Sequence, residues 1–528
     1  MGDFAYSENM YVDPEGSGDA LESFPGCRRL YGFGKRINGI FALGGCIFVH
    51  AGDGLYRFCE EERDSIHALT PIYSLADQES FNLVIGGRAY LCDGSQLLLI
   101  DHGKEIKQVN DDEKITACTT LAFLNGRLYL SGNPNCPELI FRIDESEEID
   151  PVTYECQWAV SSLLRVGDEL YAFTDGGIYA YSPDFSTVKQ ILSGISVKSN
   201  ALFALNRLVF LTDCGLMSER GEILSEKLGS KLLPLLKDAR ISVWQGYITL
   251  LCRGKILLCK ITDRRAPSWY SVLGIGAYKG DSRLYRYSTH ARDGFAVHKE
   301  PDTVATDTVM SLMDRDGNMI YYTEDEGVRY EVYPTSERVG GEFFPATHYL
   351  VSQNLLYFGA DTGDICIFNN DLRGVAPTYI SESENFNADE YAKAMGEVIH
   401  PDFYSFLGHR VRYLLMTESD DLAEPGKRKL NTPYTLTVKC KSYPRSCFDV
   451  EVISDGGKNR EDFHIDGSAV EFYDLNFSSF CPVNAETVTV SLPEKNGVFT
   501  EKQICIKGEK HDCPIGIISL EYGYRLRR

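Results

Sequence analysis

Histidine and acidic side chains at metal-ligand spacing would indicate a metal site. The ten histidines stand apart along the chain, and none belongs to an HExxH pattern or a similar pair. Segment 314–318 (DRDGN) places oxygen-bearing side chains at positions 1, 3 and 5 of a calcium-loop pattern. However, Gly317 comes two residues early and position 12 is Asp325 rather than Glu. We therefore predict a turn between strands at this segment, and no metal site in the chain.

Catalytic and cofactor-binding patterns are equally sparse. The 76 acidic residues offer many carboxylate pairs for acid–base catalysis but single out none. Glycosidases and sialidases do use propellers, but no Asp-box of the Ser-x-Asp-x-Gly-x-x-Trp type occurs, and only three Trp could serve as sugar platforms. GxxxxGK[ST] is absent, and Gly274, Gly276 and Gly280 have the wrong spacing for a dinucleotide loop. We predict no catalytic residue, no cofactor and no enzyme, and keep a propeller glycoside hydrolase as an alternative.

One group of aromatic residues could bind a ligand. Segment 323–327 is flanked by Tyr321, Tyr322, Tyr330 and Tyr333, which would suit recognition of a host glycan or surface protein. The competing interpretation is that these tyrosines are ordinary strand residues, since aromatic side chains are enriched in strands.

The elements that would position such residues come from a repeat of about forty residues. Its unit is an apolar run, a Gly-containing polar turn and a second apolar run, which is typical of a β-hairpin. Nine hairpins begin 35 to 42 residues apart, at Ile47, Ala89, Leu128, Leu170, Leu208, Ile248, Leu284, Met319 and Leu356. This period matches one four-stranded propeller blade. We predict an all-β protein with a propeller of about seven or eight blades over residues 29–375, with a stacked β-solenoid or several small sandwiches as alternatives.

The remaining segments complete the domain plan. Residues 1–28 are predicted to form an N-terminal arm, and helical spacing predicts short helices at 223–239 and 388–398. The second helix lies in a linker, 376–399. From residue 400 the pattern changes to longer alternating strands, such as 434–440, 448–453 and 487–492. We predict a C-terminal β-sandwich or jelly roll over residues 400–528.

Composition limits the function classes. The formal net charge is -23 and the pI about 4.9, which argues against ordinary nucleic-acid binding. No apolar run is long enough to span a bilayer, and the acidic N-terminus does not resemble an export signal. The 16 cysteines include no CxxC pair, so we expect reduced, buried thiols that act as small hydrophobic residues.

Residues 8 to 30 carry a resemblance to a known group. Glu8-Asn9-Met10, followed by Leu21-Glu22-Ser23-Phe24-Pro25-Gly26-Cys27-Arg28-Arg29-Leu30, resembles the opening of tailed-bacteriophage neck and tail accessory β-propeller proteins. That group includes the packaged-DNA stabilisation proteins and tail-nozzle proteins of short-tailed phages. Weaker similarity continues through 223–239, 256–261 with Trp269, and 448–452.

The resemblance implies a structural virion protein without an active site. It would be a head–tail connector or tail component, assembled in the host cytoplasm, that forms a homo-oligomeric ring around the DNA exit channel and helps to close or extend it. Its expected partners are phage portal, adaptor or tail proteins, with packaged DNA retained nearby. An acidic channel lining would let DNA slide rather than stick, although the same charge could simply keep the protein soluble. A glycan-binding module of the adsorption apparatus is the second hypothesis.

Overall fold

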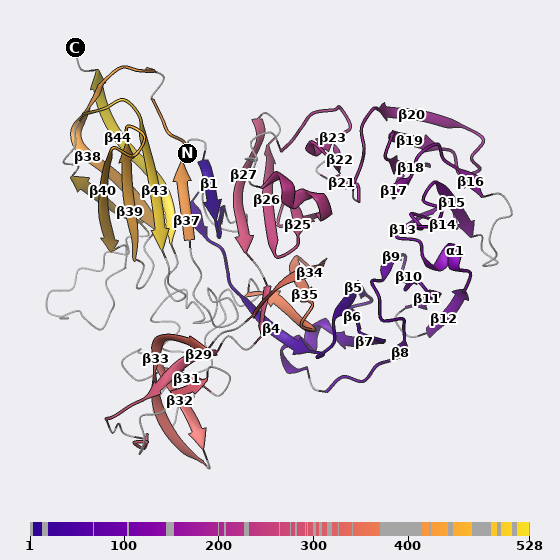
Figure 1. Ribbon diagram of the computed structural model, residues 1–528, viewed down its shortest axis with the longest axis horizontal. Helices are drawn as coiled ribbons and strands as arrows, with labels where there is room; N and C mark the ends of the chain where they lie inside the picture. Colours follow the sequence, from indigo (N-terminus) through magenta and orange to yellow (C-terminus); the bar gives the residue numbers. More distant parts are fainter. Residues whose placement is uncertain are drawn as a thin grey trace.

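The fold is all-β. The computed structural model describes residues 4–12, 20–66, 68–102, 105–143, 153–198, 200–204, 207–225, 232–262, 265–274, 276–279, 282–290, 292, 294–298, 303–305, 309–313, 319–325, 327–339, 342–369, 413–421, 424–441, 447–466, 487–493, 498–508 and 515–526. Figure 1 shows a ring of β-sheets on the right, a second β-domain on the left and a small separate sheet below them. Within the described residues, helix is confined to α1 (Glu113–Thr116) and the 3-10 turns η1 (Glu60–Ser65) and η2 (Leu233–Asp238).

The first part of the ring consists of antiparallel sheets that each use four consecutive strands, the first on the inside (Figure 1). The first two sheets are β5 (Ile37–Leu43), β6 (Cys46–Ala51), β7 (Gly54–Cys59), β8 (Tyr73–Ser74), and β9 (Phe81–Ile85), β10 (Arg88–Cys92), β11 (Leu97–Asp101), β12 (Glu105–Asn110). The next two are β13 (Thr120–Leu124), β14 (Arg127–Ser131), β15 (Leu139–Ile143), β16 (Tyr154–Glu155), and β17 (Val160–Val166), β18 (Glu169–Thr174), β19 (Gly177–Tyr181), β20 (Val188–Ser193). Each sheet buries apolar side chains against its neighbour.

The second part of the ring closes on the N-terminal side of the chain. It contains β21 (Leu202–Ala204), β22 (Arg207–Thr212), β23 (Gly215–Ser218); then β24 (Arg240–Trp244), β25 (Tyr247–Cys252), β26 (Lys255–Thr262), β27 (Arg265–Gly274); then β34 (Glu342–Ser352), β35 (Leu355–Ala360), β36 (Asp364–Phe368). The last of these sheets takes β4 (Cys27–Gly32) as its outer strand, paired antiparallel with β36. Ile37 and Ile47 of the first sheet share a core with Tyr357 and Ile365 of the last, so the ring is closed. The ring is propeller-like.

A separate sheet interrupts the last part of the ring. β28 (Gly276–Lys279) pairs with β34, and the chain between them forms β29 (Ser282–Tyr287), β30 (Thr303–Ala305), β31 (Met310–Met313), β32 (Met319–Asp325) and β33 (Val328–Val339). These strands form a five-stranded sheet of their own in the order β30-β29-β33-β32-β31. The hairpins predicted at Leu284 and Met319 therefore lie in this insertion sheet and not in the ring. β29 pairs with β33, a partner far along the sequence, which a hairpin repeat does not anticipate.

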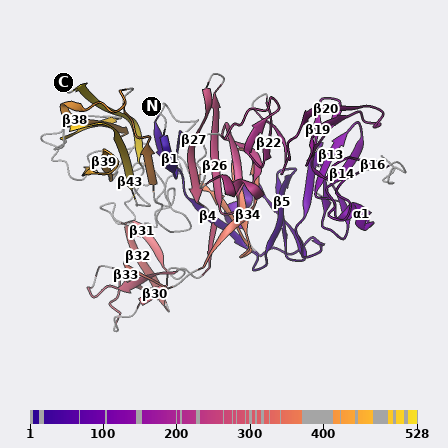
Figure 2. The ribbon, with the colours of Figure 1, turned by 45° about the horizontal axis from the view of Figure 1, so that its top comes forward.

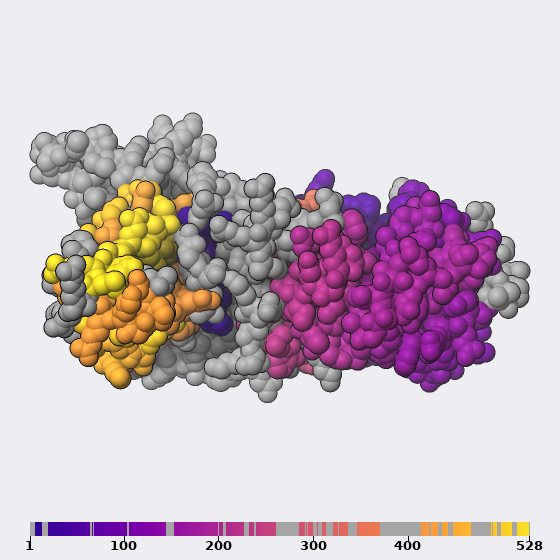
Figure 3. Space-filling model, turned by 90° about the horizontal axis from the view of Figure 1, so that it is seen from above, coloured from indigo at the N-terminus to yellow at the C-terminus, as the bar shows by residue number. Residues whose placement is uncertain are grey.

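Two sheets form the C-terminal domain around one core. One contains β37 (Tyr413–Thr417), β43 (Lys502–Gly508), β39 (Cys447–Ser454) and β40 (Asn459–Asp466). The other contains β38 (Lys429–Lys441), β41 (Thr487–Pro493), β42 (Val498–Phe499) and β44 (Gly516–Leu526). Val438 and Leu492 from one sheet and Val450 and Ile504 from the other are all buried in the same cluster. Figure 3 shows this domain in orange and yellow at the opposite end of the molecule from the purple part of the ring.

The N-terminal strands join the ring to the C-terminal domain. β1 (Phe4–Glu8) pairs in parallel with β27 of the ring and antiparallel with β37 of the C-terminal domain. β2 (Met10–Val12) and β3 (Leu21–Ser23) form a hairpin, and β3 pairs with β44. We call these three strands, with Phe24, the seam; Figure 2 shows β1 lying between β27 and β43. The predicted arm, residues 1–28, thus contributes strands to both halves of the molecule.

The structure tests one of the two predicted helices. Within the described residues of this segment, 223–225 and 232–239, the helical structure is the 3-10 turn η2, with Pro234 at its start. The prediction at 388–398 and the linker 376–399 lie outside the described residues. Among the helices in the described part of the chain, none is long and apolar enough to cross a membrane.

Candidate functional site at the axial mouth of the ring

Three charged or polar side chains, each on or just before the inner strand of a different sheet, meet across the centre of the ring. Glu79 precedes β9, Arg240 is the first residue of β24, and His348 lies in β34. The Arg240 Nη2–Glu79 Oε1 distance is 2.7 Å, and the His348 Nε2–Glu79 Oε1 distance is 3.7 Å. The β9 and β24 sheets are separated by three sheets in one direction around the ring, and in the other by two, those of β34 and β5. The contact therefore has to cross the central axis. We call these three residues the axial cluster.

A second ion-pair group involves the neighbouring turns. Asp361, in the turn between β35 and β36, is 2.9 Å from Arg253 Nη2 and 3.3 Å from Arg36 Nε. Arg36 also contributes its positive charge to the surroundings of Glu79. Positive and negative side chains therefore alternate in this region. Their ion pairs connect the first sheet of the ring to its last two sheets.

The electrostatics of the axial cluster keep Glu79 ionised. Its pKa lies below the usual value, first because of the adjacent His348 imidazole and then because of the Arg240 and Arg36 charges, while partial burial opposes the shift. His348 is nearly buried, and its Nε2 makes no hydrogen bond because 3.7 Å is too long for one. A carboxylate held in its charged form suits an ion-pair bridge better than a general acid.

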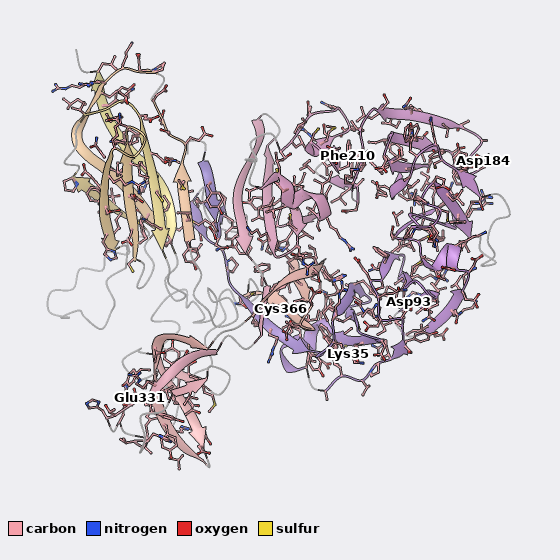
Figure 4. All side chains as sticks on the ribbon, in the orientation of Figure 1. Lys35, Asp93, Asp184, Phe210, Glu331 and Cys366 are labelled. Atoms are coloured by element: carbon pink, nitrogen blue, oxygen red, sulfur yellow. The ribbon has the colours of Figure 1, made fainter. Side chains whose placement is uncertain are left out.

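Asp93 organises the next turn on the same face. Its buried carboxylate accepts hydrogen bonds from the backbone N–H groups of Ala76, Ser95 and Gln96, at 2.9, 2.8 and 2.8 Å. Burial alone would raise the pKa of Asp93, but these hydrogen bonds outweigh it and hold the pKa below the usual value. Asp93 thus holds in place the segment between β8 and β9, which contains Glu79. Figure 4 labels Asp93 in the ring, far from Glu331 on the insertion sheet.

The candidate tyrosines lie on strands. Tyr321 and Tyr322 belong to β32, Tyr330 and Tyr333 belong to β33, and residues 323–325 continue β32. The interpretation as strand residues is therefore confirmed. Tyr322 is buried, whereas Tyr333 is 52% exposed.

The remaining sequence patterns give no site in the described part of the chain. No group of three or more His, Cys, Asp or Glu that could hold a metal ion occurs among the described residues. The calcium-like segment 314–318 and Gly280 lie outside those residues. Sequence reasoning missed the axial cluster, because Glu79 and Arg240 are 161 residues apart and nothing in either segment marks them as partners.

Comparison with known proteins gives low-level similarity to solved structures. No family model matches the chain, and no curated protein sequence matches it either. Among solved structures, the AfRom2 CNH domain is 9% identical with a TM-score of 0.37, covering 59% of this chain and 99% of that one. The N-terminal domain of Nup159 is 12% identical with a TM-score of 0.32, covering 70% and 99%. Virginiamycin B lyase from Staphylococcus aureus, an enzyme, is 12% identical with a TM-score of 0.32, covering 65% and 98%. Similarity this low carries no inference about activity.

Proposed function

We propose that the protein is a structural virion component of a tailed bacteriophage, in which a seven-bladed propeller and a C-terminal β-sandwich act as one building block of the neck or tail. Copies would assemble around the DNA exit channel, against portal, adaptor or tail proteins, and would help to close or extend it. The protein would not be an enzyme. These assignments rest on the resemblance of residues 8 to 30, together with the position that those residues take in the fold.

The position of the resembling segment is the observation that carries the proposal. Met10, Leu21 and Phe24 are all fully buried, and Cys27 is 1% exposed. They belong to a core that also contains residues of the ring and of the C-terminal domain. The residues that carry the resemblance therefore lie where the ring joins the C-terminal domain. Proteins that shared this two-domain architecture would need such a joining segment.

The pKa shifts of the described carboxyl groups suit ion pairs and turn caps. A glycoside hydrolase needs a carboxylic acid with a raised pKa to protonate the leaving group. In the described part of the chain, every carboxyl group with a shifted pKa is shifted downward: Asp53, Glu79, Asp93, Asp184 and Asp455. This pattern favours ion pairs and turn caps over acid catalysis.

Light scattering combined with negative-stain imaging tests the proposal. The purified protein would be measured alone and mixed with a candidate portal or adaptor ring. We expect a closed ring of copies or a stoichiometric ring-on-ring complex. A strictly monomeric protein that binds neither ring would overturn the proposal.

A second candidate function is recognition of a host glycan by the insertion sheet. The observation that favours it is an aromatic group: Tyr287 and His298 stack at 4.0 Å between ring centroids, and Tyr330 packs edge-on to both. A glycan array probed with the wild type and with Tyr330→Ala tests it. Glycan binding that the substitution abolishes supports recognition by this sheet. An array on which the wild type binds no glycan rules out this second candidate function.

A further inference from the structure

Two cysteines face each other on neighbouring strands of the first ring sheet. Cys46 begins β6 and Cys59 ends β7, and the two residues are direct partners in the antiparallel register. Their Sγ atoms are 3.8 Å apart, and both cysteines are free thiols. Cys59 is exposed and Cys46 is half-buried, so reagents in solvent reach the pair.

The pair occupies a position where side chains approach closely. Hydrogen-bonded and non-hydrogen-bonded pairs alternate along an antiparallel ladder. The Glu60 N–H donates to the Gly45 carbonyl at 3.1 Å, which makes the adjacent pair, Cys46 with Cys59, a non-hydrogen-bonded one. Such pairs have Cα atoms about 4.5 Å apart. A disulfide accepts Cα separations of about 4.4–6.8 Å, so side-chain rotation alone can bring the sulfurs to bonding distance.

We infer that Cys46 and Cys59 form a reversible modification site, a dithiol that a small disulfide such as oxidised glutathione converts into a cross-strand disulfide. The exposed Cys59 thiolate attacks the small disulfide, forms a mixed disulfide and releases one small thiol. The Cys46 thiolate then attacks the Cys59 sulfur and releases the second thiol. The net change is one protein dithiol and one small disulfide giving one protein disulfide and two small thiols.

The bond would be a labile one. The separation of about 4.5 Å lies at the short end of the range that disulfides accept, and strained or exposed disulfides have more oxidising potentials. Burial raises the pKa of Cys46, which slows the second step without preventing it. Under the proposed virion role, the pair would stay reduced during assembly in the cytoplasm and oxidise after release. That last step rests on the proposed function, whereas the chemistry of the pair does not.

Tryptic mass spectrometry separates the two cysteines cleanly. Cleavage at Arg57 places Cys46 in peptide 37–57 and Cys59 in peptide 58–63. The full-length native protein would be incubated with oxidised glutathione, trapped with acid and digested without reduction. We expect the two peptides joined by a disulfide, and the link lost after dithiothreitol. Absence of the linked peptides at a glutathione excess that modifies Cys214 would overturn the inference.

A substitution with an internal control tests whether Cys46 is the thiol that displaces glutathione from Cys59. Cys214 is exposed and lies in peptide 208–220, so it should keep its glutathione adduct in every variant. In Cys46→Ser, Cys59 should also keep an adduct, at a level at least about tenfold above that in the wild type, because the intramolecular second step is gone. Equal adduct levels on Cys59 in both proteins would contradict the mechanism. The linked peptide in the wild type is decisive even if the variant folds poorly.

Discussion

Replacing Phe24 with alanine tests whether the seam holds the ring and the C-terminal domain together. The Phe24 side chain is fully buried and makes edge-to-face contacts with three rings: Tyr11 at 4.7 Å, Phe368 at 5.1 Å and Trp244 at 5.5 Å. Tyr11 belongs to the seam hairpin, whereas Phe368 and Trp244 belong to two sheets of the ring. The substitution therefore opens a cavity at the joint itself.

The expected loss follows from the size of that cavity. Removing a buried phenylalanine ring costs about 3–5 kcal/mol, and each aromatic pair adds about 0.5–1.5 kcal/mol beyond area burial. We therefore expect Phe24→Ala to lower the free energy of unfolding by about 4–5 kcal/mol, near the upper end of the range.

Urea denaturation followed by tryptophan fluorescence measures this loss, because Trp244 is 1% exposed and contacts Phe24 directly. Phe203→Ala is the matched control: it deletes the same ring from inner strand β21, where Phe203 is 56% exposed. The control should lose less than about 1 kcal/mol. If Phe24→Ala lost no more than Phe203→Ala, the seam would not be the joint that we describe.

Two further substitutions test buried and charged groups. The buried Lys429 Nζ donates to the carbonyls of Glu424, Lys427 and Thr500 at 2.9, 3.1 and 2.8 Å. Lys429→Met should lower the free energy of unfolding by about 3 kcal/mol in urea denaturation, because three carbonyls lose a charged donor, while Lys427→Met, at an exposed side chain, should cost under about 1 kcal/mol. Equal losses would refute the role of the buried ammonium. For Glu79, whose folded pKa is lowered, the ionised form stabilises the fold above the unfolded pKa of about 4.3, and this contribution fades as pH falls through the folded value. Glu79→Gln should therefore be less stable than wild type at pH 7, by under about 1 kcal/mol since the side chain is half-exposed, and the difference should shrink below pH ~4; a difference independent of pH would contradict the ion-pair assignment.

Local signals in the sequence were enough to predict the hairpins. In the turn between β6 and β7, Gly52 has a φ of 56°, a conformation that favours glycine, and the apolar runs on both sides pair as expected. The regular spacing of such units then predicts a ring, because one sheet cannot cover its own faces. The same reasoning explains the error at Leu284 and Met319. A hairpin signal fixes the pairing within the hairpin but not the sheet that the hairpin joins.

Contacts between distant segments could not be predicted in this way. Glu79 and Arg240 meet only because the ring closes, and closure depends on β4 pairing with β36 more than 330 positions later in the chain. No local pattern encodes such a pairing, because strand edges offer the same backbone donors and acceptors to any partner.

The order of the N-terminal strands links closure of the ring to the C-terminal domain. β3 pairs with β44, and β4, which completes the last sheet of the ring, begins only four residues after β3 ends. Between them, Phe24 packs against Trp244 and Phe368 of the ring and belongs to a core cluster that also contains residues of the C-terminal domain. A force or a binding event that shifts the C-terminal domain must therefore act on the strand that closes the ring.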